Sequence, residues 1–433
     1  MPIIEINSNR KSRACVVYPC VSGKNAELSP EARLEEACGL ALAINLEVTH
    51  HEIVKVREIK PGTFFSRGIL DKLRPFLAET ELLIIDTSLT PIQQRNLEKE
   101  LNIKVIDRTA LILEIFGERA QTSEGKLQVE LAHLTYQRSR LVRSWTHLER
   151  QRGGAGFLGG PGETQIELDR RIIDNKIVRI KKELEKVKQT RGLQRGARQK
   201  VPYPVVALVG YTNAGKSSLF NRIANACVFA ENLLFATLDN TLRKIKLPSG
   251  REVILSDTVG FISDLPHELI MSFRATLEEV LAADIIVHVR DIANENTAIQ
   301  RRDVISVLKS LGLNDAEDQN NYIELLNKTD LLSPEQQKNL KQNKKKNTLP
   351  VSALTGEGIE DFLNKIDETL SEQNKTVSLN IPAADGALLS WLHQNALILN
   401  TRLQEDKLCL ELKISEANLS KLQHRTSSPV KFI

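Results

Sequence analysis

The 433-residue sequence predicts an α/β protein built from several domains. Three observations support this class. Short β-rich runs alternate with helical segments over the first 115 residues, two long segments carry apolar residues at helical spacing, and an apolar run at 205–209 leads through a glycine-containing loop into a helix. A single hydrophobic core seldom serves a chain of this length, so two to four domains are expected.

Composition narrows the class of protein. The hydrophobic fraction of 41% and the charged fraction of 26% are ordinary for a soluble globular protein. The longest apolar runs are too short to span a bilayer, so no transmembrane segment is expected. The first residues lack a basic region followed by an apolar stretch, so a cytoplasmic location is expected. The five scattered cysteines favour reduced thiols over a zinc site.

Residues 1–115 are expected to form an N-terminal α/β domain. Their β-rich runs and helical patterns alternate along the chain, and strands separated by helices of this length indicate a small, mainly parallel sheet. The expected strands are 14–19, 48–56, 82–86 and 104–106, and the expected helices are 30–45, 68–79 and 91–101.

Residues 116–200 are expected to form a long antiparallel helical hairpin with its linker. A short helical run at 109–116 leads into a helix that starts near Thr122, and a second helix returns. Each has an apolar stripe on one face, and two such stripes pack together. The stripes are Leu127, Leu131, Leu134 and Leu141, and Ile166, Ile173, Ile177, Ile180, Leu184 and Val187. The polar, basic segment 188–204 ends in Pro202 and Pro204 and is predicted to be a linker.

The turn of this hairpin is rich in glycine. Residues 152–163 contain six glycines, which let a backbone approach a surface closely; a flexible linker is the alternative. Residues 138–200 hold 17 Lys/Arg against 7 Asp/Glu, although the whole chain has a net charge of only +4. Such a concentration indicates a polyanionic partner, either RNA or an acidic membrane surface. The RNA-contact candidates are Arg150, Arg152, Gly153, Gly154, Phe157, Leu158, Arg170 and Arg171.

Residues 210–217, GYTNAGKS, match the phosphate-binding pattern G-x-x-x-x-G-K-[ST] without a mismatch. They lie between an expected strand and an expected helix, which is the setting that the motif requires. Backbone N–H groups of such a loop point at a β-phosphate. We expect Lys216 to bridge the β- and γ-phosphates and the Ser217 hydroxyl to coordinate Mg²⁺, which prefers oxygen ligands.

A second motif, D-T-V-G at 257–260, follows an expected strand at 252–256. Asp257 is placed to hold a metal-bound water. The N–H of Gly260 can contact a γ-phosphate only when that phosphate is present, which would make this segment a switch. Upstream, Thr237 is the candidate for the hydroxyl that completes Mg²⁺ coordination; an ordinary loop threonine is the alternative.

A third motif, N-K-T-D at 327–330, follows an expected strand at 322–326. The Asp330 carboxylate can accept hydrogen bonds from N1–H and the 2-amino group of guanine, a pair that adenine does not offer. Lys328 can lie along the ring plane. The pair Ser352 and Ala353, after a strand at 349–351, would place a backbone N–H at guanine O6.

The three motifs in this order predict a P-loop GTPase domain over residues 201–372. Phe261 stands where many regulatory GTPases carry a water-orienting Gln, so slow hydrolysis that depends on a partner is expected. Lys216, Thr237 and Gly260 are the catalytic candidates, and Ser217 and Thr237 are the Mg²⁺ ligands. The expected GTP-binding residues are Gly210, Tyr211, Thr212, Asn213, Ala214, Gly215, Lys216, Ser217, Phe235, Ala236, Thr237, Leu238, Asp239, Asp257, Thr258, Val259, Gly260, Asn327, Lys328, Thr329, Asp330, Ser352, Ala353 and Leu354.

Residues 373–433 are expected to form a small C-terminal α+β module. Strands are expected at 376–381, 396–403 and 407–414, and helices at 387–394 and 416–423. The lysine-rich segment 339–347 within the GTPase domain is expected to be a solvated loop.

The chain resembles the HflX family of translational GTPases over nearly its whole length. The most specific likeness lies at 105–109, 125–131 and 149–171, with the motifs at 210–217 and 257–261. The resemblance implies a GTPase that binds the large (50S) ribosomal subunit and its rRNA, inserts the hairpin tip near the peptidyl-transferase region, and splits or rescues stalled ribosomes under stress. Hydrolysis stimulated by that subunit would favour release, and the protein would be monomeric off the ribosome.

The resemblance also bears on cofactors. In several GTPases of this branch an asparagine at the position of Asn213 helps to bind K⁺, so K⁺ joins Mg²⁺ as a candidate cofactor. Some family members bind or hydrolyse ATP through the N-terminal domain, but residues 1–115 show no recognisable nucleotide motif.

Two other functions are weighed against ribosome splitting. An assembly factor that acts on subunit precursors would make similar contacts, and the sequence does not separate it from a splitting factor. A regulatory module bound to acidic lipid, with weak peripheral membrane association, is less favoured because the helical stripes are narrow and heptad-like.

Overall fold

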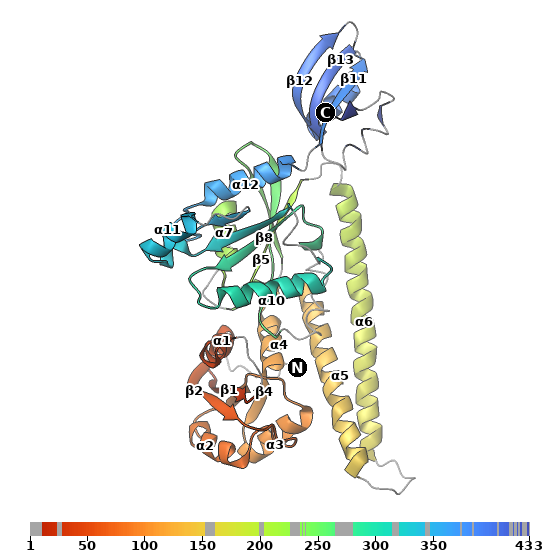
Figure 1. The fold of residues 1–433 in the computed structure, drawn as a ribbon. Helices are drawn as coiled ribbons and strands as arrows, with labels where there is room; N and C mark the ends of the chain where they lie inside the picture. The colour runs from red at the N-terminus through yellow and green to blue at the C-terminus, as the bar shows by residue number, and fades with distance from the viewer. Residues whose placement is uncertain are drawn as a thin grey trace.

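The computed structural model describes residues 11–23, 28–151, 161–198, 203–225, 234–235, 237–238, 240–264, 280–313, 320–342, 347–372, 375–382, 385–404, 407–414, 419, 422, 425–426 and 431–432. The N-terminal domain, the P-loop domain and the C-terminal module follow one another along a long axis; one long helix runs beside the N-terminal domain, and a second, longer one runs beside both that domain and the P-loop domain (Figure 1). The predicted α/β class, with these parts, is confirmed.

The N-terminal domain has a four-stranded parallel sheet in the order β2-β1-β3-β4. Its elements are β1 (Arg13–Val21), α1 (Pro30–Ala43), β2 (Glu47–Val56), α2 (Arg67–Leu77), β3 (Leu82–Ile85), α3 (Pro91–Leu101), β4 (Lys104–Asp107) and α4 (Arg108–Arg119). Thr90 and Gln93 form a capping box that starts α3 beside a proline at its first turn. Apolar clusters cover both faces of the sheet at β1, β3 and β4, whereas the edge strand β2 is largely polar and partly exposed.

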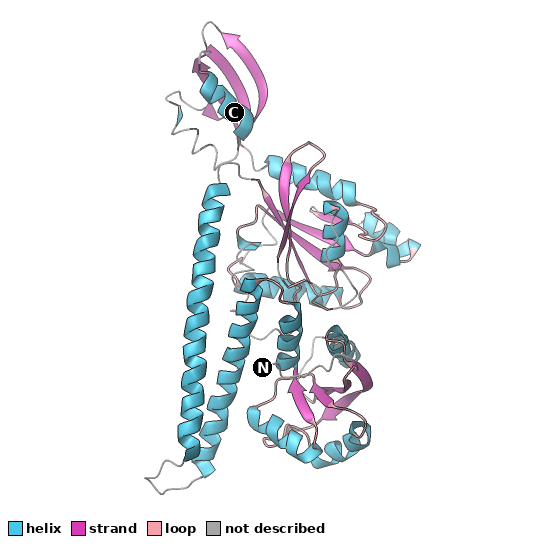
Figure 2. Ribbon diagram, turned by 180° about the vertical axis from the view of Figure 1, so that it is seen from behind, coloured by secondary structure: helices cyan, strands magenta, loops and turns pink. Residues whose placement is uncertain are grey.

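The hairpin consists of α5 (Ser123–Gln151) and α6 (Pro161–Arg198), which lie side by side in two opposite views (Figures 1 and 2). The predicted stripes meet in one apolar cluster. It contains Leu127, Leu131, Leu134, Ile173, Ile177, Ile180 and Leu184. The expected turn at 152–163 is shorter than predicted, because α6 already begins at Pro161; residues 152–160 lie outside the described residues.

The linker predicted at 188–204 is wrong for most of its length, because α6 continues to Arg198. The segment is polar and basic, but Lys, Arg, Gln and Glu are good helix formers, and single glycines only weaken a helix. The prolines that stop helices come later, at 202 and 204. The polar composition of 188–198 therefore did not distinguish a loop from an exposed helix.

The P-loop domain has a six-stranded sheet in the order β10-β9-β8-β5-β7-β6, parallel except for the edge strand β6. Its described elements are β5 (Val205–Gly210), α7 (Lys216–Ala224), β6 (Thr241–Lys246), β7 (Glu252–Asp257), β8 (Ile285–Asp291), α10 (Thr297–Ser310), β9 (Tyr322–Asn327), the 3₁₀ turn η2 (Thr329–Leu331), α11 (Pro334–Gln342), β10 (Thr348–Pro350) and α12 (Ile359–Glu372). The expected loop at 339–347 is partly helical, since α11 extends to Gln342. The three sequence motifs follow β5, β7 and β9, so the parallel strands bring them to one edge of the sheet.

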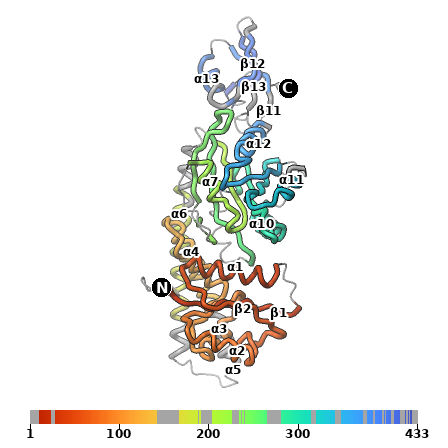
Figure 3. The backbone as a smooth tube through the Cα atoms, turned by 90° about the vertical axis from the view of Figure 1, so that its left-hand side faces the viewer, coloured from red at the N-terminus to blue at the C-terminus, as the bar shows by residue number. Residues whose placement is uncertain are grey.

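Among the described residues, the C-terminal module is a four-stranded antiparallel sheet in the order β12-β13-β11-β14 with helix α13 (Figure 3). Its elements are β11 (Lys375–Pro382), α13 (Gly386–Asn395), β12 (Ala396–Gln404), β13 (Lys407–Ile414) and β14 (Lys431–Phe432). The helix expected at 416–423 falls mostly outside the described residues.

Candidate nucleotide site

Two glycines allow the phosphate-binding loop, which follows β5, to lie close to β8 and β9. Gly210 has φ +154°, and a Cβ there would lie 2.2 Å from the backbone oxygen of Val289. Gly215 has φ +90°, and its Cβ would lie 2.2 Å from Nδ2 of Asn327. Only glycine tolerates such close backbone approach together with positive φ. The loop then passes directly into α7, whose N-terminus favours an anion.

Lys216 is the first residue of α7 and is 6% exposed. Its Nζ donates to the carbonyl oxygens of Gly210 (3.1 Å) and Tyr211 (2.9 Å). Burial lowers the pKa of Lys216 to about 8, and the nearby Asp257 carboxylate opposes this shift. The buried ammonium is thus held over the loop. Phosphate oxygens there would replace the hydrogen bonds to water that burial removes.

Three oxygen groups converge beside Lys216. The Oγ of Ser217 lies 2.7 Å from Oγ1 of Thr237, and both hydroxyls donate to Oδ2 of Asp257, at 2.7 and 3.0 Å. The other carboxylate oxygen, Oδ1 of Asp257, is buried and has no hydrogen-bond partner. Burial raises the pKa of Asp257, while Lys216 and the two hydroxyls counter that effect. Hard oxygen donors around a carboxylate with an unpaired buried oxygen fit Mg²⁺.

The segment after β7, which we call switch II (residues 257–264), lies against the phosphate-binding loop. Phe261 N donates to Gly210 O (3.1 Å), and Thr212 N donates to Phe261 O (2.7 Å). A Cβ on Gly260 would lie 3.1 Å from Lys216 Nζ, so the Gly260 backbone and the ammonium face the same space. The Phe261 side chain is 3% exposed and packs in the core, so it cannot orient a water.

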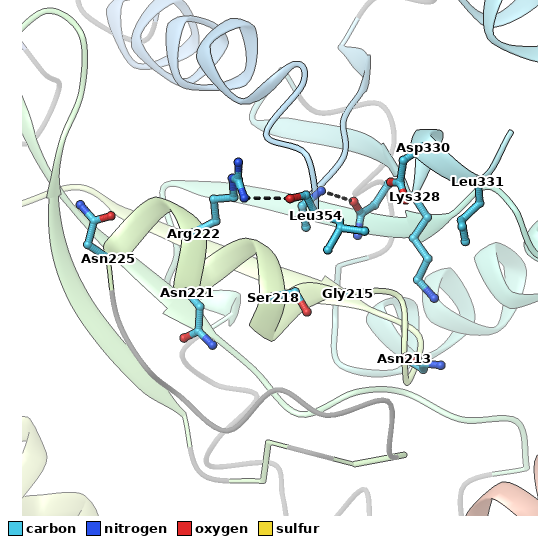
Figure 4. A pocket seen from close by; sticks show the side chains of 12 residues that line it. Asn213, Gly215, Ser218, Asn221, Arg222, Asn225, Lys328, Asp330, Leu331 and Leu354 are labelled. Carbon is cyan, nitrogen blue, oxygen red and sulfur yellow. Dashed lines mark hydrogen bonds between the residues drawn. The ribbon is translucent and has the colours of Figure 1, made fainter. Parts of the chain in front are cut away.

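The third motif lines a cavity of about 960 Å³ between α7 and the loops after β9 and β10 (Figure 4). Asn327 connects both sides: its Nδ2 donates to Ala214 O (2.8 Å) and its Oδ1 accepts from Ala353 N (3.0 Å). The half-buried Asp330 carboxylate accepts from Ser352 Oγ, and Lys328 Nζ donates to Asp291 Oδ2 at 2.6 Å. The Asp330 carboxylate is thereby oriented at the mouth of a pocket that is large enough for a base and its ribose.

For several of the predicted GTP-binding residues, the side chain is engaged elsewhere, so only the backbone is available to contact a nucleotide. Tyr211 turns its ring away from the loop, and its hydroxyl bonds to Glu36 and Ser263. Thr258 donates its hydroxyl to Leu208 O (2.6 Å). The side chains of Phe235, Leu238 and Val259 are buried in the core. Ala236 and Asp239, like Arg152, Gly153, Gly154, Phe157 and Leu158, lie outside the described residues, and of Arg150 only the backbone is described.

Sequence reasoning missed two features of the site. Arg222, on α7, donates to the carbonyl oxygens of Leu354 (2.8 Å) and Thr355 (2.6 Å), and so fixes the loop that closes the base pocket (Figure 4). Arg108, directly after β4 of the N-terminal domain, donates to Ser263 O in switch II. The one signal for Arg108 was its position beside Asp107, where a polar pair follows a buried strand.

Comparisons with known proteins cover most of the chain. Family models match residues 31–117 (GTP-binding GTPase N-terminal), 119–198 (GTP-binding GTPase Middle Region), 205–328 (50S ribosome-binding GTPase) and 338–431 (HflX C-terminal domain). A solved structure of a GTP-binding protein from the archaeon Sulfolobus solfataricus in complex with GDP is similar to 83% of this chain and 99% of that chain, with 22% identity and a TM-score of 0.44.

Two curated relatives are both named GTPase HflX. The GTPase HflX of Magnetococcus marinus is 46% identical over 394 residues, which cover 90% of each chain. The GTPase HflX of Escherichia coli strain K12 is 46% identical over 326 residues, or 75% of each chain. Together with the motif geometry, these matches show that the chain hydrolyses GTP and belongs to the HflX family of GTPases.

Proposed function

We propose that this GTPase binds the large ribosomal subunit through its hairpin and splits or rescues stalled ribosomes in the GTP state. The observation that carries the proposal is a P-loop nucleotide site with its motif segments in the same molecule as a long basic helix. On α6 the side chains of Arg170 and Arg171 are 58% and 75% exposed. Further exposed cations on the same helix are Lys176, Arg179, Lys181, Lys182 and Lys186. Such a surface matches the phosphate backbone of rRNA.

Apolar groups on the same helix support a specific contact in addition to charge attraction. Leu168, Ile172 and Val178 are 57%, 44% and 52% exposed, although large aliphatic side chains are usually buried. They lie close to the glycine-rich turn in the sequence. Ribosomal RNA and protein surfaces would cover both the cations and these apolar side chains.

The nucleotide chemistry follows from the site. Ser217, Thr237 and Asp257 would hold Mg²⁺, directly or through a water, and the metal would neutralise charge on the β- and γ-phosphates. Lys216 and the Gly260 N–H would contact the γ-phosphate. Since Phe261 cannot position the attacking water, we propose that the ribosome completes the site and stimulates hydrolysis, after which the diphosphate form leaves.

The protein would act in the cytoplasm and be monomeric off the ribosome. None of the helices that the structure describes combines the length and the apolar character needed to cross a bilayer.

Sedimentation of intact ribosomes tests the proposed function. Protein with a non-hydrolysable GTP analogue should convert them to subunits, and protein with GDP should not. Arg170→Glu combined with Arg171→Glu should reduce the slope of log affinity against log salt by about 2, because about one phosphate contact is lost at each position. Lys338→Glu, an exposed residue on α11, serves as the control.

Other results would point elsewhere. If ribosomes stay intact and only subunit precursors are bound, the protein is an assembly factor. Flotation with acidic liposomes in place of ribosome binding would indicate the membrane function. An unchanged salt slope in the double variant would show that α6 is not the RNA-binding surface.

Asn213 is proposed to help bind K⁺ near the phosphates. It is exposed, lines the cavity beside the phosphate-binding loop and has φ +58°. Ribosome-stimulated hydrolysis should be several-fold faster in K⁺ than in Na⁺ at equal ionic strength. Asn213→Ala should remove that difference. Equal rates for the unmodified protein in both salts would exclude K⁺ as a cofactor.

A further inference from the structure

A buried hydrogen-bond network joins the N-terminal domain to the GTPase site. At its centre is Arg108, the first residue of α4, which is 3% exposed. Its guanidinium donates to Asp86 Oδ1, to Glu36 Oε1 and to the backbone oxygen of Ser263 (3.0 Å). Asp86 and Glu36 belong to the N-terminal domain, while Ser263 belongs to switch II. One arginine therefore crosses the domain boundary.

Glu36 reaches the same switch residue by a second route. Its Oε2 accepts from the hydroxyl of Tyr211, the second residue of the phosphate-binding loop. That hydroxyl in turn accepts from Ser263 N (2.9 Å) and lies 2.7 Å from Ser263 Oγ. Both backbone polar groups of Ser263 are thus held by side chains that belong to, or are anchored on, the N-terminal domain. Arg33 adds an ion pair to the next residue, Asp264.

This network acts close to the γ-phosphate position. Ser263 is three residues beyond Gly260, and Phe261 between them is tied to the phosphate-binding loop by the two backbone hydrogen bonds described above. The short segment from Gly260 to Ser263 is therefore held by hydrogen bonds at both Phe261 and Ser263. A shift of Ser263 would move the Gly260 N–H relative to Lys216 Nζ.

The described residues around Thr237, which we call switch I (residues 234–235 and 237–238), also rest on the N-terminal domain. The Phe235 ring meets Phe116 of α4 edge to face, with centroids 4.7 Å apart. Leu234 lies against α1, where a Cβ on Gly39 would be 3.1 Å from its Cδ1. A single apolar cluster includes residues of both domains, among them Phe235 and Leu238. The N-terminal domain thus contacts both segments that are expected to respond to a γ-phosphate.

We propose that Arg108 and Glu36 are positioning residues for GTP hydrolysis. They hold switch II where the Gly260 N–H and the Lys216 ammonium converge on one γ-phosphate. Because coupling between sites is reciprocal, a bound triphosphate favours the docked arrangement of the two domains, and loss of the γ-phosphate weakens it. The proposal uses the GTPase activity of the family and is independent of the ribosomal proposal.

The test compares affinities of the full-length protein for GDP and for a non-hydrolysable GTP analogue, without ribosomes. Arg108→Lys keeps the charge but loses the planar fork that serves three acceptors, and Glu36→Gln loses one of two carboxylate acceptors. In each variant the affinity for the triphosphate analogue should fall at least about fivefold relative to GDP. The value of kcat should fall with it, while the dissociation constant for GDP changes less than about twofold.

Arg140→Lys is the matched control. Arg140 is also largely buried, and it donates to Asp107, Gln94 and Leu89, all in the N-terminal domain. Its replacement should leave the ratio of the two affinities unchanged. If Arg108→Lys does not fold, Tyr211→Phe removes only the hydroxyl that links Glu36 to Ser263, and it should lower the same ratio.

Two outcomes would overturn the proposal. Equal weakening of both nucleotides would mean that the network only supports the fold. An unchanged or increased preference for the triphosphate would mean that it does not position switch II for the γ-phosphate.

Discussion

Asp330→Asn is expected to change the preferred base from guanine to xanthine. Asp330 lines the cavity proposed to hold the base, and its carboxylate accepts a hydrogen bond from Ser352 Oγ. It can accept from N1–H and the 2-amino group of guanine, whereas an amide would face that amino group with its own NH₂. Xanthine carries a carbonyl at that position and restores the pairing. Since a site built around such bonds discriminates by 10⁴–10⁵, the ratio of GTP to XTP affinities should change by about 10⁴-fold or more.

Competition binding with GTP, XTP and ATP measures this preference. Asp361→Asn, an exposed acid on α12, changes the charge equally and should retain the preference for GTP. If Asp330→Asn still selects GTP over XTP, the base is recognised elsewhere in the pocket. If it binds neither nucleotide while remaining folded, the carboxylate supports the pocket and does not select the base.

Lys216→Ala is expected to reduce kcat/KM for GTP by about 10²–10³-fold or more, the loss typical when a group that stabilises transition-state charge is removed. The buried ammonium faces the space that Gly260 also faces, so nothing of equal charge and position replaces it there among the described residues. The change also removes the cation that lowers the pKa of Asp257, so that carboxyl would take up a proton more readily. Weaker phosphate and metal binding would follow together.

Single-turnover hydrolysis and calorimetric titration with GDP and a GTP analogue separate these effects. Lys338→Ala on α11 is the control for loss of one surface charge. Far-ultraviolet circular dichroism checks that both variants fold. Hydrolysis by folded Lys216→Ala within about tenfold of the unmodified rate would contradict the assigned role.

Local sequence patterns predicted the strands and helices of the N-terminal domain, because their apolar runs are short, buried and bounded by turn residues. The same holds for the hairpin stripes, where Leu131 and Ile177 meet as their spacing predicts. The P-loop motif predicted the course of its strand and helix, since a side chain at Gly210 would clash with the backbone of Val289 and one at Gly215 with the side chain of Asn327. Asp330 of the N-K-T-D motif lines the cavity next to the phosphate-binding loop, while its contact with guanine stays a prediction.

Contacts between distant segments could not be predicted in this way. Glu36 and Tyr211 are 175 residues apart in sequence, and Arg108 and Ser263 are 155 apart. The helix and strand periodicities that relate nearby residues do not extend over such distances. Charged residues that become buried also cannot be told from exposed ones by their sequence. The motif also implied that Tyr211 contacts the nucleotide, but its side chain belongs to the domain boundary. The true end of α6 was missed because charged helix formers and loop residues have similar hydropathy.

The 38 residues of α6 give the arm a length of about 57 Å at 1.5 Å per residue. One end lies at the glycine-rich turn, and the other ends at Arg198, shortly before β5 enters the P-loop domain. A rigid rod of that length that tilts by about 5° displaces its far end by about 5 Å. Under the proposed function, small rearrangements around the phosphate would be enlarged by leverage alone. The far end of α6 would then move by about the length of one helical turn.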